Sequence, residues 1–313
     1  MNILVTGGAG FIGRWTVKRL LEDGHKVWIL DDLSNGSLNN IKEFEGCGSK
    51  LEFVEGDIKN IRLLENIFSD KFDICYHLAA SINVQDSIDD PETTFRNDVM
   101  GTFNILELCR KHNIKLVFMS TCMVYDRAAD DTGIDEQHPV KPASPYAGSK
   151  LAGENLVLSY WHAYKLPVVV IRPFNTYGPF QKSGGEGGVI SIFINRSIRG
   201  EILNIYGDGK QTRDFLYVED CADFIVKAGY SGKADGHIIN AGTGRDISIN
   251  ELALLIGKDK AKIQHINHIH PQSEIQKLLC NPGKAHNVLS WKSNTGIEEG
   301  IAKTEKWILN NIK

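Results

Sequence analysis

A glycine-rich segment near the start of the chain constrains the fold more than any other feature. Residues 7–13 read Gly-Gly-Ala-Gly-Phe-Ile-Gly, between an apolar run and a helical pattern. Glycine permits a tight turn, lets backbone approach a pyrophosphate, and lets a helix pack closely on a strand. The first turn of the helix would offer free N–H groups and a positive dipole end. The segment predicts a dinucleotide-binding turn, the alternative being a tight turn that binds nothing.

An acidic pair supports the binding interpretation. Asp31 and Asp32 end the next apolar run, about 20 residues after the glycines. A carboxylate at this point can accept hydrogen bonds from the ribose hydroxyls of adenosine, and it repels a 2′-phosphate. The pair therefore favours NAD over NADP.

The order of the elements predicts an α/β fold. Apolar runs at 2–6, 26–31, 51–55, 72–77, 116–120 and 167–172 alternate with helical patterns, clearest at 11–23, 60–69, 91–112 and 145–164. This alternation is typical of a parallel sheet covered on both faces. After Pro173 come glycine-rich loops and further helices near 189–199, 218–229, 249–256 and 297–310. We expect a Rossmann-type doubly wound sheet for NAD in residues 1–174. A smaller C-terminal α/β lobe for the substrate is expected in 175–313, with 237–242 returning to the first lobe.

Composition excludes several classes of protein. The 313 residues carry 35 Lys and Arg against 39 Asp and Glu, a net charge of −4 that predicts neither a nucleic-acid nor a membrane partner. The six cysteines form no C-x-x-C pair, no apolar run reaches 18 residues, and the first residues do not resemble a signal peptide. We expect a cytoplasmic protein. A metal site at His265, His268 and His270 lacks an evident carboxylate or cysteine partner, so no metal is predicted and an exposed strand entering the substrate site is favoured.

A tyrosine and a lysine lie four residues apart in the pattern of residues 145–164. On a helix, Tyr146 and Lys150 share one face, and an ammonium near a phenol lowers the pKa of the phenol. Ser120 and Thr121 end a predicted strand, where a hydroxyl can reach a substrate oxygen. The alternative for the pair is a solvated helix face.

Nine segments together resemble one family, the extended short-chain dehydrogenases/reductases that act as nucleotide-sugar epimerases and dehydratases. The resemblance covers nearly the whole chain. It implies NAD as a tightly held cofactor, a nucleotide-sugar substrate, and a homodimer through the helices at 91–112 and 145–164. The segments are GGAGFIG at 7–13, DDLSNG at 31–36, GDI at 56–58, HLAA at 77–80, STCMVY at 120–125, SPYAGSK at 144–150, RPFNTYGP at 172–179, YGDGKQTRDFLYVEDCA at 206–222 and NAGTG at 240–244.

The resemblance also implies roles for single residues. Tyr146 would be the general base at a sugar hydroxyl, Lys150 would hold the nicotinamide ribose, and Thr121 would hydrogen-bond the sugar oxygen. Arg213 would grip the diphosphate, although an Arg-Asp pair alone is more often a surface salt bridge; His270 stands where relatives have a further arginine. The expected cofactor residues are Gly7, Gly10, Phe11, Ile12, Gly13, Asp31, Asp32, Asn35, Gly36, Asp57, Ile58, Leu78, Ala79, Ala80, Tyr146, Lys150 and Pro173. The expected substrate residues are Ser81, Cys122, Met123, Asn175, Gly188, Val189, Tyr206 and Arg213.

The triplet Thr121-Cys122-Met123 departs from the family pattern. Sugar 4,6-dehydratases carry Thr-Asp-Glu here, and methionine transfers no proton. Cys122, with an ordinary pKa near 8.5, is the candidate acid/base, or else a small buried residue. A 4-epimerase needs only Thr121, Tyr146, Lys150 and NAD.

The wider match favours dehydration. Segments 120–126, 173–194 and 206–214 resemble the GDP-N-acetylglucosamine 4,6-dehydratases of legionaminic acid biosynthesis within this family. The sequence therefore predicts C4 oxidation, loss of water across C5 and C6, and reduction at C6. A 4-epimerase is the alternative, a 5,6-dehydratase is less favoured, and an NAD-bound regulatory protein is the non-enzyme alternative.

Overall fold

The core of the molecule is a seven-stranded parallel sheet. The computed structural model describes residues 1–128, 133–184, 188–268 and 274–311. The strand order is β10-β6-β5-β4-β1-β2-β3, and every neighbouring pair is parallel. The chain runs outward from β1 in both directions, so the predicted doubly wound α/β fold is confirmed. The strands are β1 (Asn2–Thr6), β2 (Lys26–Asp31), β3 (Leu51–Glu55), β4 (Ile74–His77), β5 (Lys115–Met119), β6 (Val168–Pro173) and β10 (His237–Ala241).

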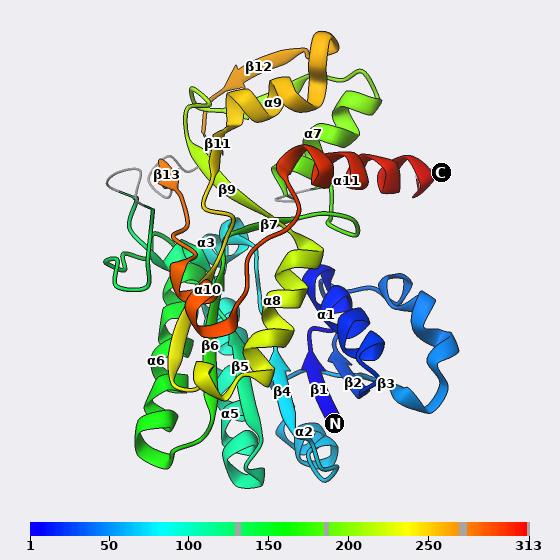
Figure 1. Cartoon of the computed structure of the whole chain (residues 1–313), viewed down its shortest axis with the longest axis vertical. Helices are drawn as coiled ribbons and strands as arrows, with labels where there is room; N and C mark the ends of the chain where they lie inside the picture. Colours follow the sequence, from blue (N-terminus) through cyan, green and yellow to red (C-terminus); the bar gives the residue numbers. More distant parts are fainter. Residues whose placement is uncertain (129–132, 185–187, 269–273, 312–313) are drawn as a thin grey trace.

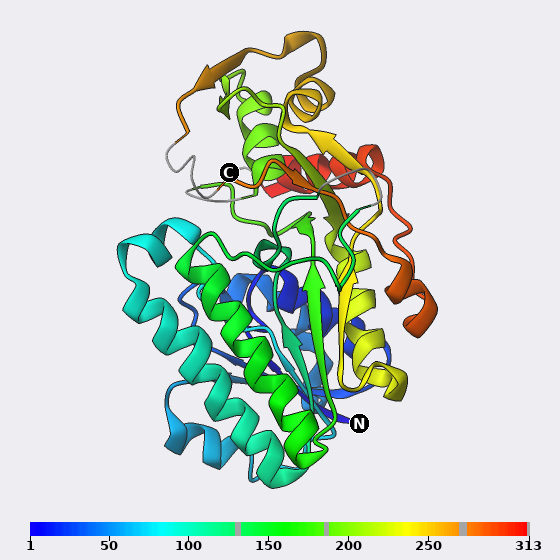
Figure 2. The same ribbon diagram turned by 90° about the vertical axis from the view of Figure 1, so that its left-hand side faces the viewer.

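Helices cover both faces of this sheet (Figures 1 and 2). Because side chains alternate along a strand, Ile3 and Val5 enter one core while Leu4 enters the other. The first core is closed by α1 (Phe11–Glu22), α8 (Val218–Tyr230) and α10 (Gly283–Leu289). The second is closed by α2 (Ile61–Ile67), α5 (Gly101–His112) and α6 (Pro145–Tyr164).

The long helix expected at 91–112 is interrupted. It consists of α4 (Pro91–Phe95), a π-helical segment at Arg96–Met100, and α5. A π-helical turn inserts an extra residue and rotates the chain that follows it. Within the π-helical segment Asp98 is buried, and its carboxylate accepts a hydrogen bond from the backbone N–H of Ser81 at 2.7 Å.

A smaller group of elements lies at the carboxyl end of the large sheet (Figure 1). Three helices and two short sheets pack around a separate apolar core. The chain then returns, because α8 packs on α1 and β10 pairs with β6. No helix among the described residues is long and apolar enough to cross a membrane. The elements are β7 (Asn175–Tyr177), α7 (Val189–Ile198), β8 (Leu203–Tyr206), β9 (Thr212–Tyr217), β11 (Asp246–Ser248), α9 (Ile249–Gly257), β12 (Ile263–Ile266), β13 (Lys277–Leu278) and α11 (Ile297–Asn311); α3 (Val84–Asp89), in the larger part, had no counterpart in the sequence prediction.

Candidate functional site

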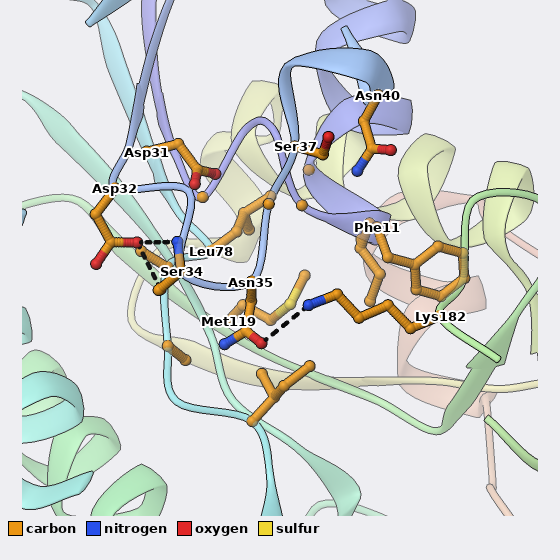
Figure 3. A pocket seen from close by; sticks show the side chains of 18 of the residues that line it. Phe11, Asp31, Asp32, Ser34, Asn35, Ser37, Asn40, Leu78, Met119 and Lys182 are labelled. Carbon is orange, nitrogen blue, oxygen red and sulfur yellow. Dashed lines mark hydrogen bonds between the residues drawn. The ribbon is translucent and has the colours of Figure 1, made fainter. Parts of the chain in front are cut away.

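A cavity of about 560 Å³ opens at the carboxyl ends of the central strands (Figure 3). This is where doubly wound sheets bind ligands, at the point where the strand order reverses. Most of the predicted cofactor residues line it: Gly7, Gly10, Phe11, Ile12, Gly13, Asp31, Asp32, Asn35, Gly36, Ile58, Leu78, Ala79 and Ala80. The structure therefore brings together residues from four separate stretches of sequence.

Two positions in the turn between β1 and α1, Gly7 and Gly13, require glycine. A Cβ on Gly13 would lie 2.0 Å from the carbonyl oxygen of Gly7, and one on Gly7 would lie 2.7 Å from the backbone nitrogen of Ala79. Gly7 also has φ +72°, which side chains disfavour. Gly10 caps α1 without a side-chain hydrogen bond, so the first N–H groups of the helix can bind an anion. The cradle fits the pyrophosphate of a dinucleotide.

The acidic pair at the end of β2 is held by the backbone. The Asp31 carboxylate accepts hydrogen bonds from the N–H groups of Ala9 (3.0 Å) and Leu33 (2.9 Å). Burial raises the pKa of Asp31, which is 6% exposed. A carboxylate has about four acceptor positions, so two bonds leave capacity for ribose hydroxyls. Asp32 accepts hydrogen bonds from the backbone and hydroxyl of Ser34 (Figure 3).

Three of the four predicted catalytic residues, Thr121, Tyr146 and Lys150, come together beside this cavity, although they do not line it. Ser144 caps α6, whose first turns carry Tyr146 and Lys150. The hydroxyl of Thr121, just beyond β5, lies near enough to the phenol of Tyr146 to lower the pKa of that phenol. The Lys150 ammonium donates to the carbonyl oxygen of Met119 at 2.8 Å. Phenol, hydroxyl and ammonium thus converge where β5 ends.

The expectation that Lys150 lowers the pKa of Tyr146 is wrong for the structure as it stands. Burial raises the pKa of Tyr146 well above its ordinary value, and the negative charge of Asp98 raises it further. The nearby hydroxyl of Thr121 acts in the opposite direction and lowers the pKa of Tyr146. Burial also lowers the pKa of Lys150, and this effect outweighs the negative charges of Asp98 and Glu154, which raise the same pKa. The phenol would need further positive charge nearby to act as a base.

The residues that replace the usual acid pair are poorly suited to proton transfer. Cys122 is 3% exposed, and burial raises the pKa of its thiol to about 12. The positive charge of Arg213 lowers that pKa, but burial outweighs it. Met123 is half-buried against the same apolar cluster as Cys122.

The predicted diphosphate residue, Arg213, is engaged with protein groups. Its guanidinium donates to the carbonyl oxygens of Thr212 (2.8 Å) and Ile275 (2.7 Å), and it pairs with the carboxylate of Glu274. That carboxylate also contacts Nε2 of His268 at 2.6 Å. A diphosphate would have to compete with Glu274 for Arg213.

The remaining substrate candidates lie on neighbouring elements. Asn175 begins β7 and pairs with Phe215, two residues beyond Arg213 on β9. The side-chain oxygen of Asn175 is buried without a hydrogen-bond partner in the described structure. Gly188 lines the cavity, and Val189 begins α7. Tyr206 ends β8, and its ring lies 5.6 Å from that of His268. The backbone N–H of Ser81 donates to the carboxylate of Asp98.

Two other motifs have structural roles. His265 lies on β12 and bonds to the carbonyl oxygen of Gly207 at 2.9 Å, whereas His270 falls outside the described residues. No cluster of three metal-binding side chains occurs in the described part of the chain. The NAGTG segment wraps Asp214, whose carboxylate accepts hydrogen bonds from Thr243 and Gly244. The segment therefore holds Asp214, a residue of β9, through these hydrogen bonds.

The cavity also contains residues that sequence reasoning missed. Phe180, Gln181 and Lys182 come from the second half of the chain, and only the fold brings them to the first. Ser34, Ser37 and Asn40 were detectable, since they continue the loop after Asp31-Asp32. Conversely, four of the predicted cofactor residues do not line the cavity, namely Asp57, Tyr146, Lys150 and Pro173. The other missed lining residues are Leu30, Ile82, Asn83, Asn97 and Met119, whereas Gly56 and Gly184 belong to segments that the sequence had singled out.

Comparison with known proteins agrees with this geometry. The model of the NAD dependent epimerase/dehydratase family matches residues 3–242. A putative UDP-glucose 4-epimerase from Methanocaldococcus jannaschii is 39% identical over 311 residues, covering 99% of each chain. The X-ray structure of Pal from Bacillus thuringiensis superposes with a TM-score of 0.98 at 66% identity, covering 99% of each chain. A crystal structure of dTDP-glucose 4,6-dehydratase from Bacillus anthracis in complex with NAD superposes with a TM-score of 0.89 at 32% identity, covering 99% of this chain and 97% of that one.

Proposed function

Because this chain belongs to the NAD dependent epimerase/dehydratase family and uses NAD as its cofactor, we propose that it is a nucleotide-sugar 4-epimerase. In this reaction the C4 hydroxyl is oxidised and the resulting ketone is reduced from its opposite face. Bound NAD supplies a hydride acceptor for the first step and a donor for the second. The protein must supply a base at the C4 oxygen and a site in which the sugar can rotate to present its opposite face.

The protein groups for the first requirement are in place. Tyr146 would take the proton from the C4 hydroxyl, and a hydrogen bond from the nearby hydroxyl of Thr121 would stabilise the phenolate. The carbonyl oxygen of Met119 holds the Lys150 ammonium in a position where its charge can face a nicotinamide ribose. The positive charge of the oxidised nicotinamide would favour the phenolate against the effect of burial.

One observation favours epimerisation over dehydration, and it concerns the burial of Cys122. Dehydration needs a base for the C5 proton and an acid for the departing hydroxyl. A buried thiol with a pKa near 12 is a poor base at neutral pH, and Met123 has no proton to give. The sequence favoured dehydration, but this burial favours epimerisation, which needs neither group.

Dehydration remains the second candidate because Arg213 exerts an opposing effect. Its positive charge lowers the pKa of Cys122. If a bound diphosphate drew Glu274 away from Arg213, the guanidinium would be freer to stabilise a thiolate. The resemblance to GDP-N-acetylglucosamine 4,6-dehydratases supports the same candidate.

We favour a uridine diphosphate sugar as substrate. The putative epimerase that matches almost the full chain is named for a UDP-sugar, whereas the GDP prediction rests on the resemblance of three segments. Both UDP-glucose and UDP-N-acetylglucosamine are therefore tested as substrates.

Product analysis tests the proposal. The protein is incubated separately with UDP-glucose, UDP-N-acetylglucosamine and GDP-N-acetylglucosamine, and products are followed by mass and proton NMR. We expect unchanged mass with an inverted C4 centre from a UDP-sugar. Loss of one water would establish dehydration, and no turnover of any substrate would favour the regulatory alternative. As a control, Tyr146→Phe should lower turnover by about 10²- to 10⁴-fold while NAD stays bound.

We also propose the homodimer that the resemblance implies. Met100, Phe103 and Tyr164 are exposed apolar residues in or beside the helices α5 and α6, which lie side by side in Figure 2. Light scattering after size-exclusion chromatography should give twice the monomer mass of 34.8 kDa. A monomer at micromolar concentration would contradict this proposal.

A further inference from the structure

A short segment from the second half of the chain forms one wall of the NAD cavity. Phe180, Gln181 and Lys182 line it, together with the glycine turn and the loop after β2. The segment follows β7 and precedes α7. It therefore links the smaller group of elements to the cofactor.

Aromatic contacts fix this segment in place. The indole N–H of Trp15, on α1, donates to the carbonyl oxygen of Pro179 at 3.2 Å. The Phe180 ring lies 4.0 Å from the guanidinium carbon of Arg14 and 4.7 Å from the ring of Trp307, on α11. Phe180 also has φ +71°, a backbone conformation that costs free energy in a bulky residue. Such a conformation persists only when the surrounding contacts hold it.

Polar contacts fix the next residue. The side-chain nitrogen of Gln181 donates to the carbonyl oxygen of Thr176 at 3.0 Å, and its oxygen accepts from the hydroxyl of Ser191 at 3.1 Å. Gly188 leaves the space that Gln181 fills, since a Cβ there would lie 2.1 Å from the Gln181 side chain. With the two residues before it anchored, Lys182 starts from a fixed backbone position.

Lys182 extends from this fixed point across the cavity (Figure 3). Its ammonium lies 3.5 Å from the side-chain oxygen of Asn35, a long contact that leaves other donors free. Among the described residues lining the cavity, Lys182 alone carries a positive charge, against the carboxylates of Asp31 and Asp32. The glycine turn at residues 7–13 contains no lysine or arginine.

The charge of the cofactor makes this placement significant. The diphosphate of NAD carries two negative charges, and the N-terminus of α1 offers only a partial positive charge. We propose that Lys182 binds the diphosphate of NAD and holds the dinucleotide in the cavity. The inference rests on NAD as cofactor and not on which sugar reaction follows. An enzyme that oxidises and reduces within one turnover gains from such retention.

Cofactor binding tests the proposal without any sugar substrate. Lys182→Met removes the charge and keeps the length of the side chain, and Lys182→Arg keeps the charge. Lys141→Met is the matched control, because the Lys141 side chain is 75% exposed and pairs with Asp126 outside the cavity. Dissociation constants for NAD, ADP-ribose, NADP and adenosine are measured by calorimetry on cofactor-stripped protein, after equal thermal stability of the stripped proteins is checked.

We expect Lys182→Met to weaken NAD and ADP-ribose alike, by about 10- to 100-fold, as for a lost charged hydrogen bond. Adenosine binding should be unchanged, Lys182→Arg should restore most of the NAD affinity, and Lys141→Met should match the parent protein. Unchanged NAD affinity in Lys182→Met would overturn the proposal. A loss confined to NADP would assign the lysine to a 2′-phosphate instead, and an equal loss for adenosine would assign it to packing of the loop.

Discussion

Cys122 is the residue at which epimerisation and dehydration demand different chemistry. Its thiol is buried beside Thr121, and its pKa is raised to about 12. The sequence identified the position but could not give its burial, because burial there depends on Phe174, Ile275 and other residues far along the chain. A proton-transfer role predicts a large loss of turnover when the sulfur is removed, and a packing role predicts a small one.

Cys122→Ala should therefore retain turnover within about threefold, the loss being no more than a small change in packing. The measurement is steady-state turnover of the UDP-sugar, with Tyr146→Phe as the inactive reference. A fall of about 100-fold or more would match loss of an acid/base group and would restore dehydration as the favoured outcome.

His77 gives a second prediction at this scale, one that concerns stability. Its ring lies between the hydroxyls of Thr6 (2.7 Å) and Thr102 (3.0 Å), and burial lowers its pKa to about 3. Between the ordinary pKa near 6.5 and this value, the unfolded chain binds a proton that the folded protein does not. The stabilising effect is thus complete above about pH 6.5 and lost as the pH falls toward 3.

The free energy of unfolding should drop by about 2 kcal/mol from this residue between about pH 7.5 and pH 5. Urea denaturation of the parent protein and of His77→Gln measures it, because the other titrating groups are shared. Equal pH dependence in the two proteins would show that His77 does not contribute as described.

The turn between β1 and α1 is the element on which cofactor binding depends. Its glycine spacing could be recognised from the sequence because the steric requirement for glycine is local. The strands with continuous apolar runs could be recognised in the same way. The π-helical segment at Arg96–Met100 was not readable, since its sequence alone also fits a regular helix. Short strands such as β7 and β13 were also missed, because they exist only by pairing with β9.

Gly13→Ala tests the turn. Its Cβ would meet the backbone of Gly7 and Gly8, at 2.0 Å and 2.8 Å, and backbone cannot move aside as a side chain can. We expect a loss of about 3 kcal/mol in unfolding free energy and loss of bound NAD. Gly148→Ala, within α6 and with no atom near the added Cβ, should instead stabilise by about 0.5 to 1 kcal/mol. Similar values for the two variants would refute the steric argument.

At the scale of the whole molecule, the two groups of elements are not independent. The proposed boundary at residue 174 does not separate them, because α8 and α10 cover one face of the large sheet and β10 pairs at its edge. Residues 180–182 also line the cofactor cavity. The sequence pattern suggested the return of 237–242. It could not place the segment 179–182 on the cofactor cavity, because that contact joins residues distant in sequence.

A fragment of residues 1–174 should therefore fail to fold cooperatively. Without α8, buried residues such as Phe224 and Ile225 are missing from the core against Ile3 and Val5. The expected observation is a broad thermal transition and strong binding of a hydrophobic dye. A fragment with a sharp transition that binds NAD would show that the first lobe is a folding unit on its own.

The fate of the hydrogen at C4 tests the central claim most directly. A UDP-sugar carrying deuterium at C4 is turned over, and the label is located in the product by deuterium NMR. Our account predicts that deuterium leaves C4 and returns to C4, giving both configurations at that carbon with the mass unchanged. Deuterium at C6 with loss of water would show dehydration and contradict the proposed function.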